Sequence, residues 1–269
     1  MEIRTSLLGM LLTAVLLLTG LQTASAEVDY NSRTVRVTGM GAFPPRAVNA
    51  AQARMMARRA AVADGYRQLA ESIKGVQVDA ETTVQDFITQ SDTINTKISA
   101  VIQGARILSE QIIPDGGYEV VMEVPLFGIS NSVAEAVIER PTTVIPFPEP
   151  VQTPSVKVQV SGGYTGVIID CRGMNINFVM SPVVKDSSGV KLYGHQNLDY
   201  DMVIRDGMVS YASDMSQASR AGSNPLVIKA ERLDDHNANP VISVNDGSRL
   251  LMENQSAGFL SKTAVVFLY

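Results

Sequence analysis

Residues that most often carry enzyme chemistry are scarce in this sequence. Its 269 residues include one cysteine, Cys171, and two histidines, His195 and His236. With a single cysteine the chain forms no internal disulfide, so its fold must depend on a hydrophobic core. The sequence also lacks a Gly-rich phosphate-binding loop and a Gly-X-Ser-X-Gly nucleophile elbow. We therefore predict no catalytic residue, no cofactor and no enzymatic activity.

An excess of positive charge is missing as well. The chain has 22 Lys and Arg against 27 Asp and Glu, a net charge of -5, so it has no overall attraction for nucleic acid. Beyond the amino terminus, no apolar run reaches the roughly 20 residues that a membrane span needs. We expect partners among envelope proteins or envelope surfaces.

The amino terminus has the pattern of a cleavable secretory signal peptide over residues 1–26. Arg4 supplies positive charge, an apolar run covers residues 7–18, and small residues precede the expected cleavage between Ala26 and Glu27. The alternative is a membrane anchor, but polar residues after position 20 interrupt the run. Because no cysteine follows the run to be acylated, we expect an exported protein, periplasmic or outer-membrane-associated, without a lipid anchor.

A proline-rich segment divides the rest of the chain. Five prolines lie in residues 141–154, where they remove backbone donors and favour an extended, semi-rigid linker. The predicted organisation is a first domain at 34–129, a helix and proline-rich linker at 130–155, and a second domain at 156–269.

The first domain has the pattern strand, helix, helix, hairpin. A strand is predicted at 34–38, ending at Gly39. Two helices with apolar residues at spacings of three, four and seven follow, and they end at Gly75 and Gly104. Strands at 105–113 and 118–126 are joined by Pro114-Asp115-Gly116-Gly117, a turn sequence typical of hairpins. This order predicts a small antiparallel sheet with two helices on one face, an α+β fold, whose exposed strand edges could serve assembly.

The second region has short strand-like runs separated by turns, and it predicts a mixed-sheet α+β domain. The hairpin connection is expected at 186–189, and the best short helices are 214–220 and 247–254. The predicted strands are 156–160, 166–170, 183–184, 208–211, 226–228, 241–244 and 264–268.

Three arginines are candidates for contact with a ligand or partner. Arg54 and Arg58 are stacked neighbours on the first helix and could form a basic stripe for anionic lipid or peptidoglycan. The alternative is a solvated helix face, on which Arg67 has the spacing to pair with Asp64 and Glu71. Arg172, at the end of an apolar strand, could hold an anion with its forked donors, or could form an ordinary ion pair with a neighbouring acid.

Two further clusters contain residue types that occur in catalytic or metal sites. Cys171 as a nucleophile would need His195 or His236 to accept its proton, and nothing in the sequence places either beside it, so a semi-buried structural cysteine is favoured. Asp234, Asp235 and His236 are metal ligands by type, but three adjacent residues seldom converge on one ion. We favour a solvated loop and assign no metal.

Several short blocks follow one another along the first domain: Val37-Thr38-Gly39-Met40-Gly41, residues 51–61, Gly104-Ala105-Arg106 and residues 118–126. Together they resemble the Lpp-twenty lipoprotein family, in which the blocks have the same order. The likeness covers about 34–128 and extends distantly to the amino-terminal domain of flagellar assembly protein T. It implies an envelope-located domain of small α+β design, used for assembly or protein contacts, without catalytic residues.

These features predict an exported, non-enzymatic cell-envelope protein that acts in assembly or protein contacts. Candidate partners are envelope proteins, a second copy of the chain, and flagellar basal-body components. The alternative function is a binding module for an envelope ligand such as peptidoglycan.

Overall fold

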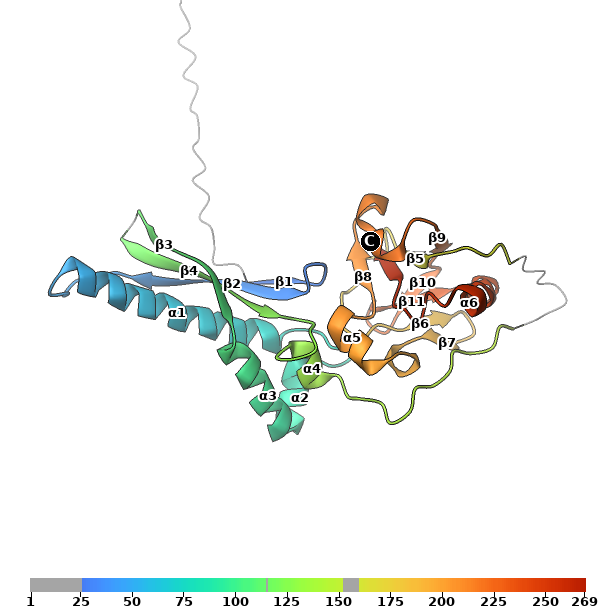
Figure 1. Ribbon diagram of the computed structural model, residues 1–269, viewed down its shortest axis with the longest axis horizontal. Helices are drawn as coiled ribbons and strands as arrows, with labels where there is room; N and C mark the ends of the chain where they lie inside the picture. The colour runs from blue at the N-terminus through green and yellow to red at the C-terminus, as the bar shows by residue number, and fades with distance from the viewer. Residues whose placement is uncertain (1–25, 115, 152–159) are drawn as a thin grey trace, which may run out of the picture.

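The computed structural model describes residues 26–114, 116–151 and 160–269. The predicted signal peptide lies almost wholly outside these residues, as do Asp115 of the predicted turn and residues 156–159 of a predicted strand. Figure 1 shows an elongated first domain on the left and a second domain on the right. The α+β class predicted for both is confirmed.

The first domain is built on a four-stranded antiparallel sheet in the order β1-β2-β4-β3. Its strands are β1 (Glu27–Asp29), β2 (Thr34–Ala42), β3 (Arg106–Ile113) and β4 (Gly117–Pro125). Helix α1 (Ala50–Lys74) runs along this sheet (Figure 1) and buries Ala57, Ala61 and Leu69. The predicted hairpin of the last two strands is therefore present, and β4 lies inside the sheet while β3 forms an edge.

Strand β2 does not end at Gly39, as the sequence had suggested, but continues to Ala42. A Cβ atom on Gly39 would overlap the carbonyl oxygen of Ala61, and one on Gly41 would overlap that of Ala57. Both glycines thus lie under α1 and let the helix backbone approach the strand closely. Their role is close packing, and the strand continues through them.

The second predicted helix, which ends at Gly104, is in fact two helices, α2 (Val84–Gln90) and α3 (Asp92–Gln103). Ser91 separates them because its backbone is extended and its side chain accepts a hydrogen bond from the Ile94 N–H. A short helix, α4 (Val133–Val137), packs with α3 near the end of α1 (Figure 1).

The second domain contains two small sheets. One is parallel throughout, in the order β8-β12-β5-β9, and the other is mixed, in the order β10-β11-β6-β7. The strands are β5 (Gly166–Asp170), β6 (Val184–Asp186), β7 (Lys191–Tyr193), β8 (Ser210–Ala212), β9 (Pro225–Lys229), β10 (Arg232–Asp234), β11 (Asn239–Ile242) and β12 (Val265–Leu268). The helices are α5 (Tyr200–Asp206) and α6 (Val244–Ala257), with 3-10 turns at His195–Asn197, Met215–Gln217 and Ser219–Ala221.

Most predicted elements of this domain lie close to observed ones. The predicted helix at 214–220 is two 3-10 turns, and the predicted helix at 247–254 is the centre of α6. Sequence reasoning missed α5, β7 and β10, each of which is seven residues or shorter. Short elements carry too few residues to show a period.

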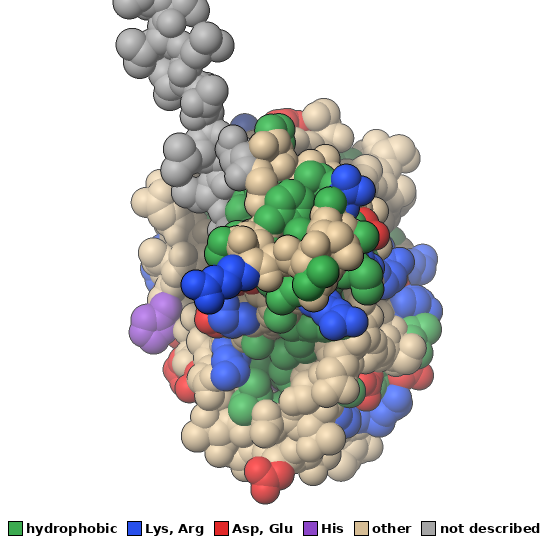
Figure 2. Space-filling model, turned by 90° about the vertical axis from the view of Figure 1, so that its left-hand side faces the viewer, with side chains coloured by type: hydrophobic (Ala, Val, Ile, Leu, Met, Phe, Trp, Pro, Cys, Tyr) green, Lys and Arg blue, Asp and Glu red, His purple; other side chains and the backbone are tan. Residues whose placement is uncertain are grey.

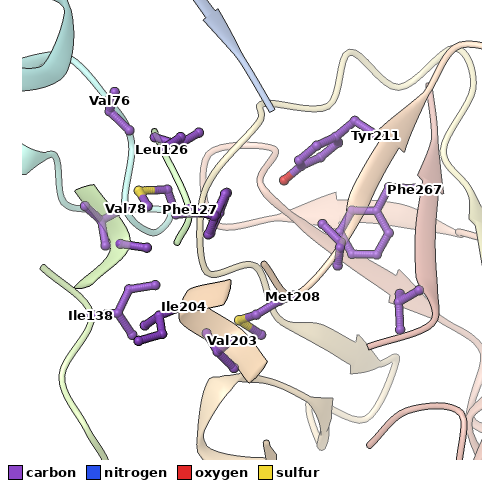
Figure 3. Close-up of a cluster of buried hydrophobic side chains, with 14 of the residues drawn as sticks. Val76, Val78, Leu126, Phe127, Ile138, Val203, Ile204, Met208, Tyr211 and Phe267 are labelled. Atoms are coloured by element: carbon purple, nitrogen blue, oxygen red, sulfur yellow. The ribbon is translucent and has the colours of Figure 1, made fainter. Parts of the chain in front are cut away.

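The two domains pack against each other through a continuous apolar core. Phe127 of the first domain lies with Ile204 and Met208 of the second (Figure 3), and all three belong to one cluster of buried side chains. Backbone hydrogen bonds cross the same boundary: the Ser181 N–H donates to the Val78 carbonyl at 2.7 Å, and the Gly128 N–H donates to the Ile204 carbonyl at 2.7 Å. Their relative position is therefore fixed by burial and by satisfied backbone groups.

The proline-rich segment between the domains packs on the second domain over its described part. The Ile145 N–H donates to the Gln196 carbonyl at 2.8 Å, and the ring of Phe147 stacks on that of Tyr193 with 6.5 Å between centroids. Further along, the Ser248 hydroxyl donates to the Val151 carbonyl. This stretch is thus held along its length by the domain that it precedes.

Candidate functional site

Strand β3 is exposed along almost its whole length. Seven of its eight residues are exposed and the eighth is half-buried, although four of the eight are isoleucine or leucine. Ile107 is 42% exposed and Ile112 is 49% exposed. Helix α1 covers β2 and β4 on one side of the sheet, and in the described residues no strand pairs with the outer edge of β3. Apolar side chains beside unpaired backbone groups at a sheet edge form a surface suited to contacts.

The exposed side of β3 faces the flank of α1. Ile107, Glu110 and Ile112 pair with β4 residues that point toward the helix side of the sheet, and Arg58 of α1 donates to the Glu110 carboxylate at 2.8 Å. Met55, one turn before Arg58, is 58% exposed. We call Met55, Arg58, Ile107, Glu110 and Ile112 the α1–β3 face. Figure 2 shows apolar side chains gathered on this end of the molecule, with Lys and Arg side chains around them.

The charge around the α1–β3 face is positive. Residues 43–63 contain four arginines and no acidic residue. Arg54 is exposed, and within the described residues it forms no ion pair, whereas Arg58 is held by Glu110. Arg67, further along α1, pairs with Asp64 at 2.7 Å and with Glu71 at 2.8 Å, as its spacing predicted. The predicted basic stripe is thus partly neutralised, and its unpaired charge is concentrated toward the start of the helix.

On the other face of the sheet, a buried carboxylate binds two arginines. Glu123 of β4 is only 6% exposed, and it accepts hydrogen bonds from Arg36 and Arg106, each at 2.8 Å. Desolvation raises the pKa of Glu123, but the hydrogen bonds and charges of the two arginines outweigh it and leave the pKa below its ordinary value. Arg106 thereby ties β3 to β4 on this face, so the edge strand is fastened without burying its apolar side chains.

Arg172 is engaged by its neighbour. Its guanidinium donates two hydrogen bonds to the Asp170 carboxylate, at 2.9 and 2.7 Å. Asp170 lies at the end of β5, and the side-chain hydrogen bonds from Arg172 hold the pKa of Asp170 below its ordinary value. The sequence left open whether Arg172 holds an anion or forms an ordinary ion pair, and the structure shows the ion pair.

Cys171 and the histidines do not form a nucleophilic pair. The Cys171 thiol is buried and its one hydrogen-bond partner in the described residues is the Ile169 carbonyl at 3.7 Å. Burial, together with the charge of Asp170, raises the pKa of the thiol to about 12. The ring of His195 contacts the Ser181 hydroxyl at 3.3 Å, and His236 is exposed. The thiol therefore lacks a base and has the character of a structural residue.

The acidic loop near His236 is held by cations of the chain itself. Asp235 pairs with Lys185 and Asp234 pairs with Arg232 at 2.9 Å. No group of three or more His, Cys, Asp or Glu side chains in the described ranges is arranged to hold a metal ion. None of the helices that the structure describes is long and apolar enough to cross a membrane.

Together, the fold and the site define a two-domain α+β protein with an exposed apolar surface on its first domain. Residues 32–125 match the family model of the LPP20 lipoprotein, which confirms the resemblance drawn from the sequence blocks. Residues 166–269 match the model described as Treponema pallidum Tp0624, second domain. Among curated proteins, none matches the chain. The distant likeness to flagellar assembly protein T stays a prediction.

Proposed function

We propose that this chain is a non-enzymatic protein of the cell envelope that makes protein contacts through its α1–β3 face. The observation that carries the proposal is the exposure of β3, whose isoleucines are not covered by the rest of the described chain and whose Glu110 is bound by Arg58 of α1. The match of the first domain to the LPP20 lipoprotein supports an envelope location. The predicted secretory signal supports it independently.

The charges around the face indicate the chemistry of the partner. Four arginines lie in residues 43–63 without an acidic neighbour in that segment. A second copy of the chain would bring the same arginines toward its own, and like charges at an interface are unfavourable. A protein surface with an apolar centre and an acidic rim complements the face, so we commit to such a heterologous partner. Flagellar basal-body components are one group in which to look for it.

Site-specific photo-crosslinking in cells tests the proposal. A crosslinking residue at position 112 is expected to capture one discrete partner, whereas the same residue at Val227 is not. Val227 is the matched control because it is also 49% exposed, on strand β9 of the second domain. Charge reversal by Arg54→Glu should weaken capture at position 112, and Lys74→Glu at the other end of α1 should not. Equal capture at 112 and 227, or capture of a second copy of the chain, would contradict the proposal.

A further inference from the structure

The boundary between the domains contains an open cleft of about 650 Å³. One wall is the turn between β1 and β2, with Tyr30, Asn31 and Arg33, and the other wall comes from the second domain between α5 and β12. The volume lies within the roughly 300–1,000 Å³ typical of small-molecule sites. Both walls meet here because Tyr30 packs edge-on against Tyr211, with 5.7 Å between ring centroids.

Positive charge exceeds negative charge in the cleft. Its lining includes Arg33, Arg220 and Lys262 but one carboxylate, Asp206. That carboxylate is already shared, because Arg205 donates to it at 2.8 Å and Arg33 approaches it at 3.5 Å. Neither Arg220 nor Lys262 has a carboxylate partner in the described residues. An anion in the cleft would therefore meet an uncompensated positive field.

Arg220 contributes positive charge to the cleft from a position that its hydrogen bonds hold fixed. Its guanidinium donates to the carbonyls of Asp206, Gly207, Val209 and Thr263, and to the Thr263 hydroxyl. All of these partners are neutral. The hydrogen-bond donors of Arg220 are therefore satisfied, but its positive charge is not neutralised by a carboxylate among them. Burial lowers the pKa of Arg220 from its ordinary value, although Tyr193 and Asp206 act in the opposite direction. Arg220 thus fixes one wall of the cleft and polarises it.

The remaining lining is rich in unused donors. Lys262 is exposed, and the one hydrogen bond that its ammonium group makes with the described residues is a long one of 3.4 Å to the Ala257 carbonyl. The contacts of Arg33 are also long, at 3.4 and 3.5 Å. The side-chain amide nitrogens of Asn31 and Gln217 donate to no described residue, and the Ser210 hydroxyl is shielded from solvent without a partner. A ligand with several acceptor oxygens would satisfy these donors.

We propose that the cleft between the domains binds the oxyanion group, carboxylate or phosphate, of a small polar ligand, with Arg33 and Lys262 as the contacting cations. Because the two contacting residues belong to different domains, the bound anion bridges them. Binding to the folded state alone stabilises it by mass action. The ligand should therefore raise the unfolding temperature of the whole chain.

The test is a titration of the chain, purified without its predicted signal, with sodium phosphate and separately with sodium citrate. Sodium chloride at matched ionic strength is the comparison, and binding is followed by amide NMR shifts and by the unfolding temperature. We expect saturable shifts at residues lining the cleft and a rise in unfolding temperature with phosphate, citrate or both. Binding of one anion alone identifies the group as phosphate or carboxylate, and binding of both shows that the cleft accepts either oxyanion. Responses no larger than those with chloride would overturn the proposal.

Two substitutions make the test specific to the cleft. Arg33 has a positive φ of 60°, and Asn tolerates this conformation well, so Arg33→Asn removes the charge without adding backbone strain. Lys262→Gln removes the other charge at an exposed position, and Lys74→Gln is the control. We expect each cleft variant to weaken binding about tenfold, equivalent to about 1.4 kcal/mol, and the control to bind normally. Lys262→Gln gives up only the long hydrogen bond to the Ala257 carbonyl, so unchanged affinity in this variant would overturn the proposal whatever the outcome at the α1–β3 face.

Discussion

Strands β3 and β12 are both rich in apolar residues, yet their surroundings are opposite. All four residues of β12 are buried, whereas seven of the eight residues of β3 are exposed. Strand β12 lies inside the parallel sheet, with β5 on one side and β8 on the other, and β3 is an edge of the antiparallel sheet. Apolar side chains in this protein therefore have two uses. Those of β12 stabilise the fold, and those of β3 are available for contacts.

The largest effect on stability is expected from the buried strand. Phe267 of β12 is fully buried and meets the ring of Tyr211 edge-on at 5.8 Å. Phe267→Ala removes this packing and leaves a cavity, so the free energy of unfolding should fall by about 3–5 kcal/mol. Urea unfolding followed by circular dichroism measures the change. A loss near zero would mean that the second domain does not depend on this core.

The covered part of the first sheet should also be sensitive, though less so. Gly39→Ala puts a methyl group where the Ala61 carbonyl lies, so α1 must move away from β2. We expect a loss of about 1–3 kcal/mol in the free energy of unfolding. Gly75→Ala is the control because a Cβ at that position meets its nearest atom at an ordinary 3.6 Å. Equal behaviour of the two variants would contradict the close contact.

A smaller and pH-dependent effect is expected at Glu123, which fastens β3 through Arg106. The pKa of Glu123 is lowered in the folded state from its ordinary value of 4.5. Its contribution is therefore fully present above pH 4.5 and is lost as the pH falls through the folded-state pKa. Glu123→Gln should cost about 1–2 kcal/mol at pH 7. The difference from the unmodified chain should shrink below pH 4.5 in unfolding curves measured across pH, and a constant difference would exclude the ionised carboxylate as its cause.

The smallest effect on stability is expected on β3. Ile112 is about half exposed, so Ile112→Ser gives up little buried area and should change the free energy of unfolding by less than about 0.5 kcal/mol. The same urea experiment measures it. A loss comparable to that of Phe267→Ala would show that Ile112 belongs to the core after all.

The sequence predicted the kinds of element well where a period or a glycine marked them. The helix ends at Gly75 and Gly104 and the hairpin of β3 and β4 follow from such local signals. The break between α2 and α3 also had a local signal, since Ser91 caps the start of α3. The close contact of Gly39 with Ala61 had none, because it depends on a helix that comes later in the chain.

The two candidate sites were harder to predict because both depend on how distant elements meet. The exposure of β3 follows from the strand order, which places β4 between β2 and β3, and no residue of β3 encodes that order. The cleft brings Arg33 of the first hairpin to Lys262 near the carboxyl terminus. Arg172, which the sequence suggested as a contact residue, instead forms an ion pair with its own neighbour Asp170.

The contact role of the α1–β3 face is tested most directly by one paired measurement. A photo-crosslinking residue is placed at position 55 in the unmodified chain and in the double variant Ile107→Ser, Ile112→Ser, and capture in cells is compared with the unfolding midpoint of each purified protein. We predict that the double variant loses capture of the partner while its unfolding midpoint stays close to that of the unmodified chain. Retained capture, or a midpoint lowered as far as that of Phe267→Ala, would contradict the account.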